Sequence, residues 1–127
     1  MNMITRRSAF RTAMALAAGS ATLQAANSKK LSKKELQALI ERAKSSADHR
    51  KLSDYYSDLA IEYDAESNQH TAMAESYTKN PTIQEMKNPG GATTAGHCRF
   101  FAAKYKEMAE TARTMSTMHA EMAKAAK

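Results

Sequence analysis

The chain has 127 residues, with one cysteine, no tryptophan and a formal net charge of +6 at pH 7. Residues 1–26 contain three arginines and no acidic residue, so residues 27–127 hold 16 basic and 13 acidic side chains, a net charge of +3. This weak charge, without a basic stripe interleaved with aromatic residues, argues against a nucleic-acid-binding protein. About 100 residues form one domain whose core is small for a monomer.

Residues 1–26 have the layout of a secretory signal peptide: a basic start, an uncharged stretch rich in Ala, Met and Leu, and a small-residue end. Arg6 and Arg7, followed by Ser8 and Ala9, are similar to a twin-arginine export signal. An ordinary secretory signal with two arginines is the alternative. Either predicts export from a bacterial cytoplasm, to the periplasm or outside the cell, with residues 27–127 as one α-helical domain without a membrane span.

Two capping boxes begin the helical region. Ser32 and Glu35 predict a short helix over 33–44, and Ser45 and Asp48 predict that a second helix starts near Ala47. The second helix has no Gly or Pro before Asn80 and repeats every seven residues, which predicts a coiled-coil seam. The residues of this seam are His49, Leu52, Tyr56, Leu59, Tyr63, Glu66, His70, Met73 and Tyr77.

Residues 80–96 contain both prolines and predict a loop with one helical turn around Ile83–Lys87. Thr93 or Thr94 caps a last helix over about 95–125. The seam predicted for this helix consists of Cys98, Phe101, Tyr105, Met108, Ala112, Met115, His119, Met122 and Ala126. We therefore expect an all-α protein, an antiparallel hairpin of two long helices with a short N-terminal helix. Because the core is small, we expect two hairpins to dimerise into a four-helix bundle.

The seams gather histidine, cysteine and methionine, which together suit copper, Cu(I) especially. Met115, His119 and Met122 lie on one face of the last helix, although methionine also fills cores. Cys98 cannot form an internal disulfide and is either a ligand or a small buried side chain. The candidate metal ligands are His49, His70, Cys98, His119, Met115 and Met122. The accessory candidates are His97, Met73, Glu66, Tyr56, Tyr63 and Tyr105.

The register of the hairpin separates a metal site from a core. Facing residues of an antiparallel pair have numbers with a nearly constant sum. A sum near 168 places His49 opposite His119 and His70 opposite Cys98, which predicts two ligand clusters. The first cluster adds Met115 and Met122, and the second adds Met73 and His97. The same register places Tyr63 opposite Tyr105.

A sum near 175 is the alternative register. It places His119 opposite Tyr56 and His70 opposite Tyr105, so the histidines become hydrogen-bonded core partners of tyrosines. The loop has a suitable length for both registers, so its length does not choose between them.

Other chemistry has weaker support. The tyrosines are an alternative lining for a haem slot, but no CxxCH motif is present. Glu66, at a predicted core position, needs a partner, yet its spacing from His70 does not match a di-iron carboxylate site. Catalytic motifs such as GxSxG and HExxH are absent from the sequence, so we do not expect an enzyme.

The pattern Asp48-His49-x-x-Leu52-x-x-Tyr55-Tyr56, then His70, His97-Cys98 and His119-x-x-Met122-Ala123, resembles a group of small exported bacterial α-helical proteins to which no activity is assigned. The resemblance covers about residues 32–125 and implies a helical hairpin. Two functions follow as expectations. One is an exported binding protein that holds copper or, less favoured, haem. The other is a structural or chaperone-like periplasmic protein that has no cofactor and binds protein clients.

Overall fold

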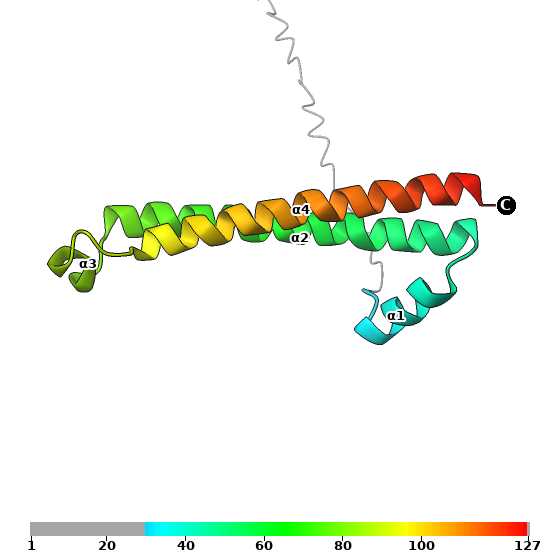
Figure 1. Cartoon of the computed structure of the whole chain (residues 1–127), viewed down its shortest axis with the longest axis horizontal. Coiled ribbons are helices and arrows are strands. Elements are labelled where there is room, and N and C mark those ends of the chain that lie inside the picture. The colour runs from blue at the N-terminus through cyan, green and yellow to red at the C-terminus, as the bar shows by residue number, and fades with distance from the viewer. Residues whose placement is uncertain (1–29, 127) are drawn as a thin grey trace, which may run out of the picture.

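The structure is a computed structural model that describes residues 30–126. It contains four helices in this range, α1 (Lys33–Arg42), α2 (Ser46–Lys79), α3 (Ile83–Lys87) and α4 (Thr94–Ala125), and no strand within the described residues. Figure 1 shows α2 and α4 side by side over their whole length, with α3 at one end and α1 folded back at the other. The predicted all-α hairpin is therefore confirmed. The predicted signal peptide lies outside the described residues.

The predicted helix starts are also confirmed, because each is fixed by side chains that bond to the first turn. Capping boxes open three helices, with Ser32, Ser45 and Thr82 as the N-cap residues. Thr93, not Thr94, caps α4 and accepts a hydrogen bond from the Gly96 amide. The first helix ends at Arg42, two residues before the predicted end.

The loop end of the hairpin is held by Glu85 of α3. Its carboxylate accepts hydrogen bonds from the backbone amides of Thr82 and Thr94, and these bonds hold the pKa of Glu85 below its usual value. One side chain thus caps its own helix and ties α3 to the first residue of α4.

Each predicted seam consists of two rows of residues at seven-residue intervals, which we call tracks. The observed seam between α2 and α4 differs from the predicted one in one of these tracks. The predicted track of His49, Tyr56, Tyr63 and His70 is half-buried. The other predicted track is displaced by small residues one position further along each helix, most of which are buried. In α2 the small residues are Ser53, Ala60, Ser67 and Ala74, and in α4 they are Ala95, Ala102, Ala109, Ser116 and Ala123.

Five predicted seam positions are exposed: Glu66, Phe101, Met108 and Met122 on the displaced track, and Tyr77 near the end of α2. Glu66 is exposed and needs no buried partner, while Phe101 and Met108 are 49% and 42% exposed. Met122, on the same track, is 41% exposed. Heptad spacing fits a track on either side of the aromatic residues equally well, so the spacing alone does not show which side faces the partner helix. The small side chains face it because they let the two backbones approach more closely.

Serine hydroxyls demonstrate this close approach. Ser67 donates to the carbonyl oxygen of Ala102 at 2.7 Å, and Ser116 donates to that of Ser53 at 2.8 Å. A serine side chain reaches the backbone of a neighbouring helix only when the two helices lie very close together. These bonds also fix the register, because each forms only when its two residues are at the same level.

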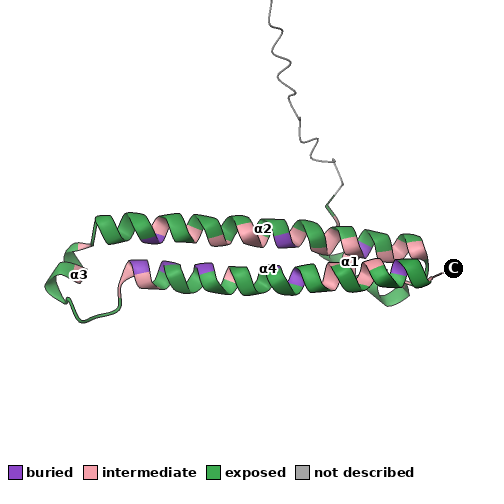
Figure 2. Ribbon diagram, turned by 90° about the horizontal axis from the view of Figure 1, so that it is seen from above, coloured by how far each residue is buried: buried purple, intermediate pink, exposed green. Residues whose placement is uncertain are grey.

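The short helix α1 packs on α2 near the start of α2, where Leu39 of α1 and Leu52 of α2 are both buried. An ion pair between Lys30 and Glu62 adds a second link between these parts of the chain. Figure 2 shows that the remaining surface of both long helices is mostly exposed. Within residues 30–126, no helix has the length and hydrophobicity needed to cross a membrane.

Candidate metal centre

Two histidines meet across the hairpin at the end where α1 lies. The Nδ1 atoms of His49 on α2 and His119 on α4 are 3.2 Å apart, and the ring centroids are 5.4 Å apart. Tyr63 and Tyr105 also face each other, with ring centroids 6.0 Å apart. The residue numbers of both pairs sum to 168, so the first of the two predicted registers is the observed one.

His119 and His70 also stack on the tyrosines that the second register predicted as their partners. His119 lies parallel to Tyr56, with an angle of 3° between the rings, and His70 lies at 14° to Tyr105. These contacts arise because long side chains lean along the helix axis and reach the neighbouring level. The tyrosines therefore support the histidine rings as stacking partners within the first register.

The surroundings of His119 disfavour its protonated form. Burial, and then the nearby charge of His49, lower the pKa of His119 below its usual value near 6.5. The short Nδ1–Nδ1 distance needs one nitrogen to donate its hydrogen and the other to accept it. Two neutral imidazoles therefore meet here, and the neutral imidazole is the form that binds a metal ion.

The separation of the two nitrogens also fits a metal ion. Two imidazole nitrogens bound at 2.0–2.1 Å with a tetrahedral angle between them lie about 3.3 Å apart. The observed distance is 3.2 Å, so the separation of the two nitrogens would change little if they bound one metal ion. Two ligands at opposite sides of the ion would need about 4 Å.

Further ligands at this centre must come from other residue types. Among residues 30–126, no group of three or more His, Cys, Asp and Glu side chains is placed to hold a metal ion. Met115 is half-buried, Met122 is exposed, and both lie one helical turn from His119 on its face of α4. Their thioethers, or water, are the groups available to complete the coordination of a metal.

The two long helices also share a repeated residue pattern, with seven identities in 26 positions, a feature the sequence prediction missed. Residues 49–74 align without gaps with residues 98–123, at an offset of 49 residues or seven heptads. The pairs that are identical are Arg50/Arg99, Tyr56/Tyr105, Ala60/Ala109, Ser67/Ser116, His70/His119, Met73/Met122 and Ala74/Ala123. Because the helices run antiparallel, a pseudo-two-fold axis relates them.

Structural contacts follow this pseudo-symmetry. The stack of Tyr56 on His119 has its equivalent in the stack of Tyr105 on His70, with centroids 5.7 and 5.5 Å apart. The hydrogen bonds of the two serines Ser67 and Ser116 are equivalent in the same way. The ion pair between Asp64 and Arg113 spans the axis itself, because each residue is the counterpart of the other. The signal that reveals these residues is the 49-residue offset.

The axis makes His70 and Cys98 the counterparts of His119 and His49. Cys98 is buried with a free thiol, and the Nδ1 atom of His70 is buried without a hydrogen-bond partner. The His70 ring lies against Phe101 and Tyr105, and within the described residues no hydrogen bond joins it to Cys98. The two residues of the second predicted cluster thus lie at the same level of the hairpin, but they do not contact each other through a hydrogen bond as His49 and His119 do.

The remaining candidates of the second cluster do not converge. His97 is exposed, as expected for a residue next to a buried cysteine on a helix, and Glu66 is exposed at the position equivalent to Met115. Met73 is half-buried and lies one helical turn from His70. Met122 has the same spacing from His119 but is exposed. No protein-family model, curated protein or solved structure matches this chain, so its function must be inferred from the chain itself.

Proposed function

We propose that the protein is an exported helical binding protein that holds a copper ion between His49 and His119. The observation that carries the proposal is the 3.2 Å separation of their Nδ1 atoms, which is the distance between two ligands of one tetrahedral metal ion. The stack of Tyr56 on His119 holds one ligand ring in place before the metal arrives. The protein acts in the periplasm or outside the cell and is not an enzyme.

Copper is the proposed metal because the nearby residues are soft ligands. Imidazole binds several transition metals, but thioethers favour Cu(I) and are poor ligands for zinc, magnesium and calcium. Met115 and Met122 supply thioethers on the same face as His119, while carboxylates do not join the pair among the described residues. A two-imidazole, thioether-rich centre therefore favours Cu(I) over harder ions.

His70 and Cys98 are proposed as a second copper centre. The unpartnered Nδ1 of His70 and the free thiol of Cys98 occupy positions equivalent to the first pair. A thiolate is a stronger ligand for Cu(I) than imidazole, so the exchange of histidine for cysteine keeps the site suited to the same metal.

Copper loading under reducing conditions, in competition with a chromophoric Cu(I) chelator, tests both centres. We expect His119→Ala to abolish binding at the first centre and Cys98→Ser to abolish binding at the second. His97→Ala is the matched control, since His97 is exposed and belongs to neither pair. Unchanged copper affinity and stoichiometry in both His119→Ala and Cys98→Ser would refute the proposal.

The chaperone-like function is the second candidate, and the exposed apolar side chains of α4 are the observation that favours it. Phe100, Phe101 and Met118 are each about half exposed. Suppression of the aggregation of an unfolded client protein tests this function. A chaperone would keep this activity in the double variant His49→Ala/His119→Ala, whereas copper binding would be lost. Haem, the less favoured cofactor, is tested in parallel by its absorbance after addition of haemin.

The dimer predicted from the sequence belongs to this proposal as well. A homodimer that forms a four-helix bundle would supply the apolar burial that the hairpin alone lacks. The surface through which it forms is argued next.

A further inference from the structure

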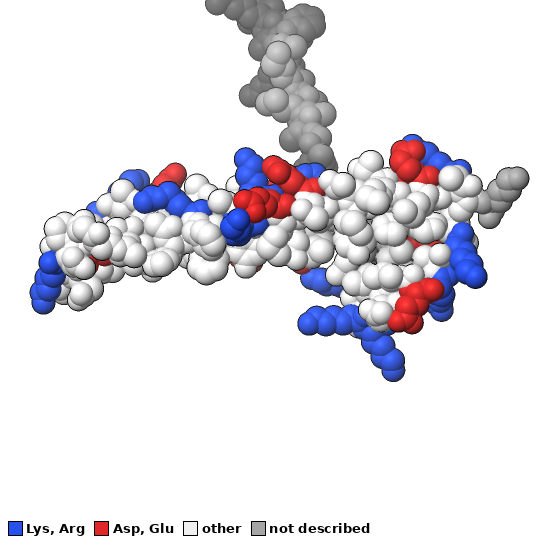
Figure 3. Space-filling view, in the orientation of Figure 1, with Lys and Arg blue, Asp and Glu red and all other residues white. Residues whose placement is uncertain are grey.

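The half of the hairpin next to α3 presents an apolar surface that no other described element covers. We call it the loop-end face and define it as the half-buried or exposed side chains of Met73, Tyr77, Phe101, Tyr105 and Met108. In Figure 3, the edge of the molecule between α3 and α1, on the side where α1 lies, is mostly free of charged residues. These side chains come from both long helices, so the face extends across the pair.

The internal repeat shows what the loop-end face lacks. Leu52 and Leu59, on the half of the hairpin where α1 packs, are the counterparts of Phe101 and Met108. Leu52 is 1% exposed and Leu59 is half-buried, whereas Phe101 and Met108 are 49% and 42% exposed. The same face of the same repeat is therefore covered in one half and bare in the other.

The core of the hairpin gives a reason for the bare half to be covered. The buried apolar residues are mostly alanines, with Leu39 and Leu52 as the large exceptions. Alanine contributes little apolar area, and burying a large apolar side chain contributes about 1.5–3 kcal/mol. The large apolar side chains of the loop-end face thus add to stability only when a partner covers them.

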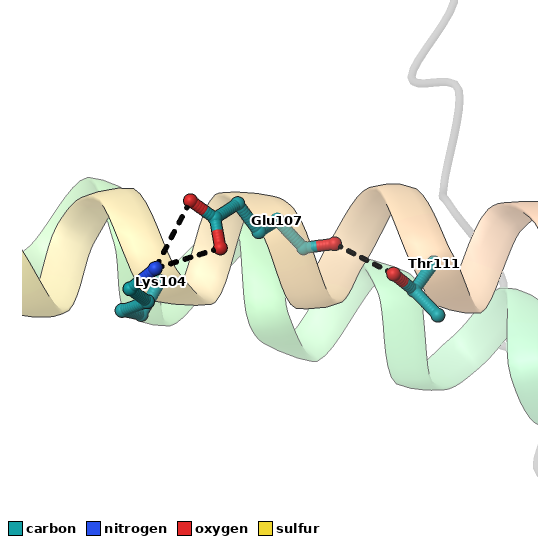
Figure 4. Close-up of polar contacts among 3 residues, drawn as sticks. All are labelled: Lys104, Glu107 and Thr111. Atoms are coloured by element: carbon teal, nitrogen blue, oxygen red, sulfur yellow. Dashed lines mark hydrogen bonds and ion pairs between the residues drawn. The ribbon is translucent and has the colours of Figure 1, made fainter.

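The charges beside the face allow it to meet a copy of itself. Glu66 of α2, one heptad before Met73, and Lys104 of α4, between Phe101 and Met108, are exposed and bring opposite charges to the face. Lys104 is held by Glu107, whose backbone carbonyl also accepts a hydrogen bond from Thr111, as Figure 4 shows. The ammonium group lies 5.8 Å from the centroid of Phe100. In a two-fold arrangement, each copy offers both an acidic and a basic side chain to its partner, which favours pairing over repulsion.

We propose that the loop-end face binds the loop-end face of a second copy of this chain. The two hairpin halves form a four-helix bundle, and the two α1 helices lie at its outer ends, where they leave the His49–His119 centres outside the interface. This inference does not depend on copper, and its test is made with a metal chelator present.

Sedimentation equilibrium of the purified chain over a wide range of concentrations tests the dimer. We expect a monomer–dimer equilibrium that Phe101→Glu shifts to monomer, because the new carboxylate would be buried without a partner. Ile61→Glu is the matched control, since Ile61 is 65% exposed on α2 outside the face. Circular dichroism shows whether each variant keeps its helices.

Methionine oxidation by dilute hydrogen peroxide gives a second readout in the unmodified chain. Met108 lies in the face, and Met118 lies on the same helix outside it with a similar exposure. We expect the oxidation of Met108 to slow as the protein concentration rises, while that of Met118 stays constant. A chain that is monomeric at every concentration, or a dimer that protects Met118 and not Met108, would overturn the proposal.

Discussion

The two halves of the hairpin carry the same repeat but differ in what surrounds it. At the end where α1 lies, two histidines form a closed pair and the apolar flank of α2 is covered. At the loop end, His70 and Cys98 lie at the same level of the hairpin, and the Nδ1 atom of His70 has no hydrogen-bond partner. Phe101 and Met108, the counterparts of Leu52 and Leu59, are exposed there. The comparison teaches that the repeat provides the backbone and the ring stacking, while the positions that differ, such as His49 and Cys98, decide which side chains meet in each half.

The largest predicted effect is a difference in stability between substitutions at two equivalent apolar positions, Leu52 and Phe101. Leu52→Ala removes a fully buried side chain and should lower the free energy of unfolding by about 2–5 kcal/mol. The equivalent change Phe101→Ala should cost less than about 1 kcal/mol when the protein is dilute and monomeric, because Phe101 is half exposed. Urea denaturation measures both. Equal losses would show that the two flanks are equally buried.

The second prediction tests whether the small residues between α2 and α4 are packed equally tightly on both helices. Ala60 and Ala109 are counterparts, and both are buried between the backbones of α2 and α4. Ala60→Leu and Ala109→Leu should each destabilise the hairpin by about 1–3 kcal/mol, since a larger side chain pushes the helices apart. Met108→Leu, next to the seam, is the control and should cost less than about 1.5 kcal/mol. The midpoint of thermal unfolding ranks the three variants.

A smaller effect is expected from the serines that bond across the hairpin. Ser67→Ala and Ser116→Ala each remove a hydrogen bond to a backbone carbonyl of the other helix and should cost about 0.5–1.5 kcal/mol. Chemical denaturation should show the larger loss for Ser116→Ala, because the Ser116 hydroxyl also lies 3.1 Å from that of Ser53, whose counterpart is Ala102. Ser76→Ala, at an exposed position of α2, should leave stability nearly unchanged.

The smallest predicted effect is the pH dependence that only the closed histidine pair provides. The folded state lowers the pKa of His119, so below its usual value near pH 6.5 the unfolded state binds more protons than the folded state. Stability should therefore fall as the pH decreases from about 6.5 toward the lowered pKa. His119→Gln should flatten this part of the profile, and His97→Gln should not. A profile that is identical in all three proteins would contradict the assigned cause.

The sequence predicted most residues of the candidate site, but it did not determine that His49 and His119 meet. The residues of the first cluster and the register sum of 168 were predicted together with the alternative of 175. The spacing of His49 and Tyr56 by one heptad made both registers equally consistent with the sequence. The hydrogen bonds of Ser67 and Ser116, which join residues whose numbers sum to 169, separate them.

The sequence by itself determined the helices, because capping boxes and heptads act through local contacts and helical spacing. It also contained the repeat, in the 49-residue offset between the two long helices. Only the tertiary structure decided which side of the aromatic track faces the partner helix. That choice is made by how closely two backbones can approach, and the small residues that permit this approach leave Glu66 and Met108 at the surface while they bring His49 to His119.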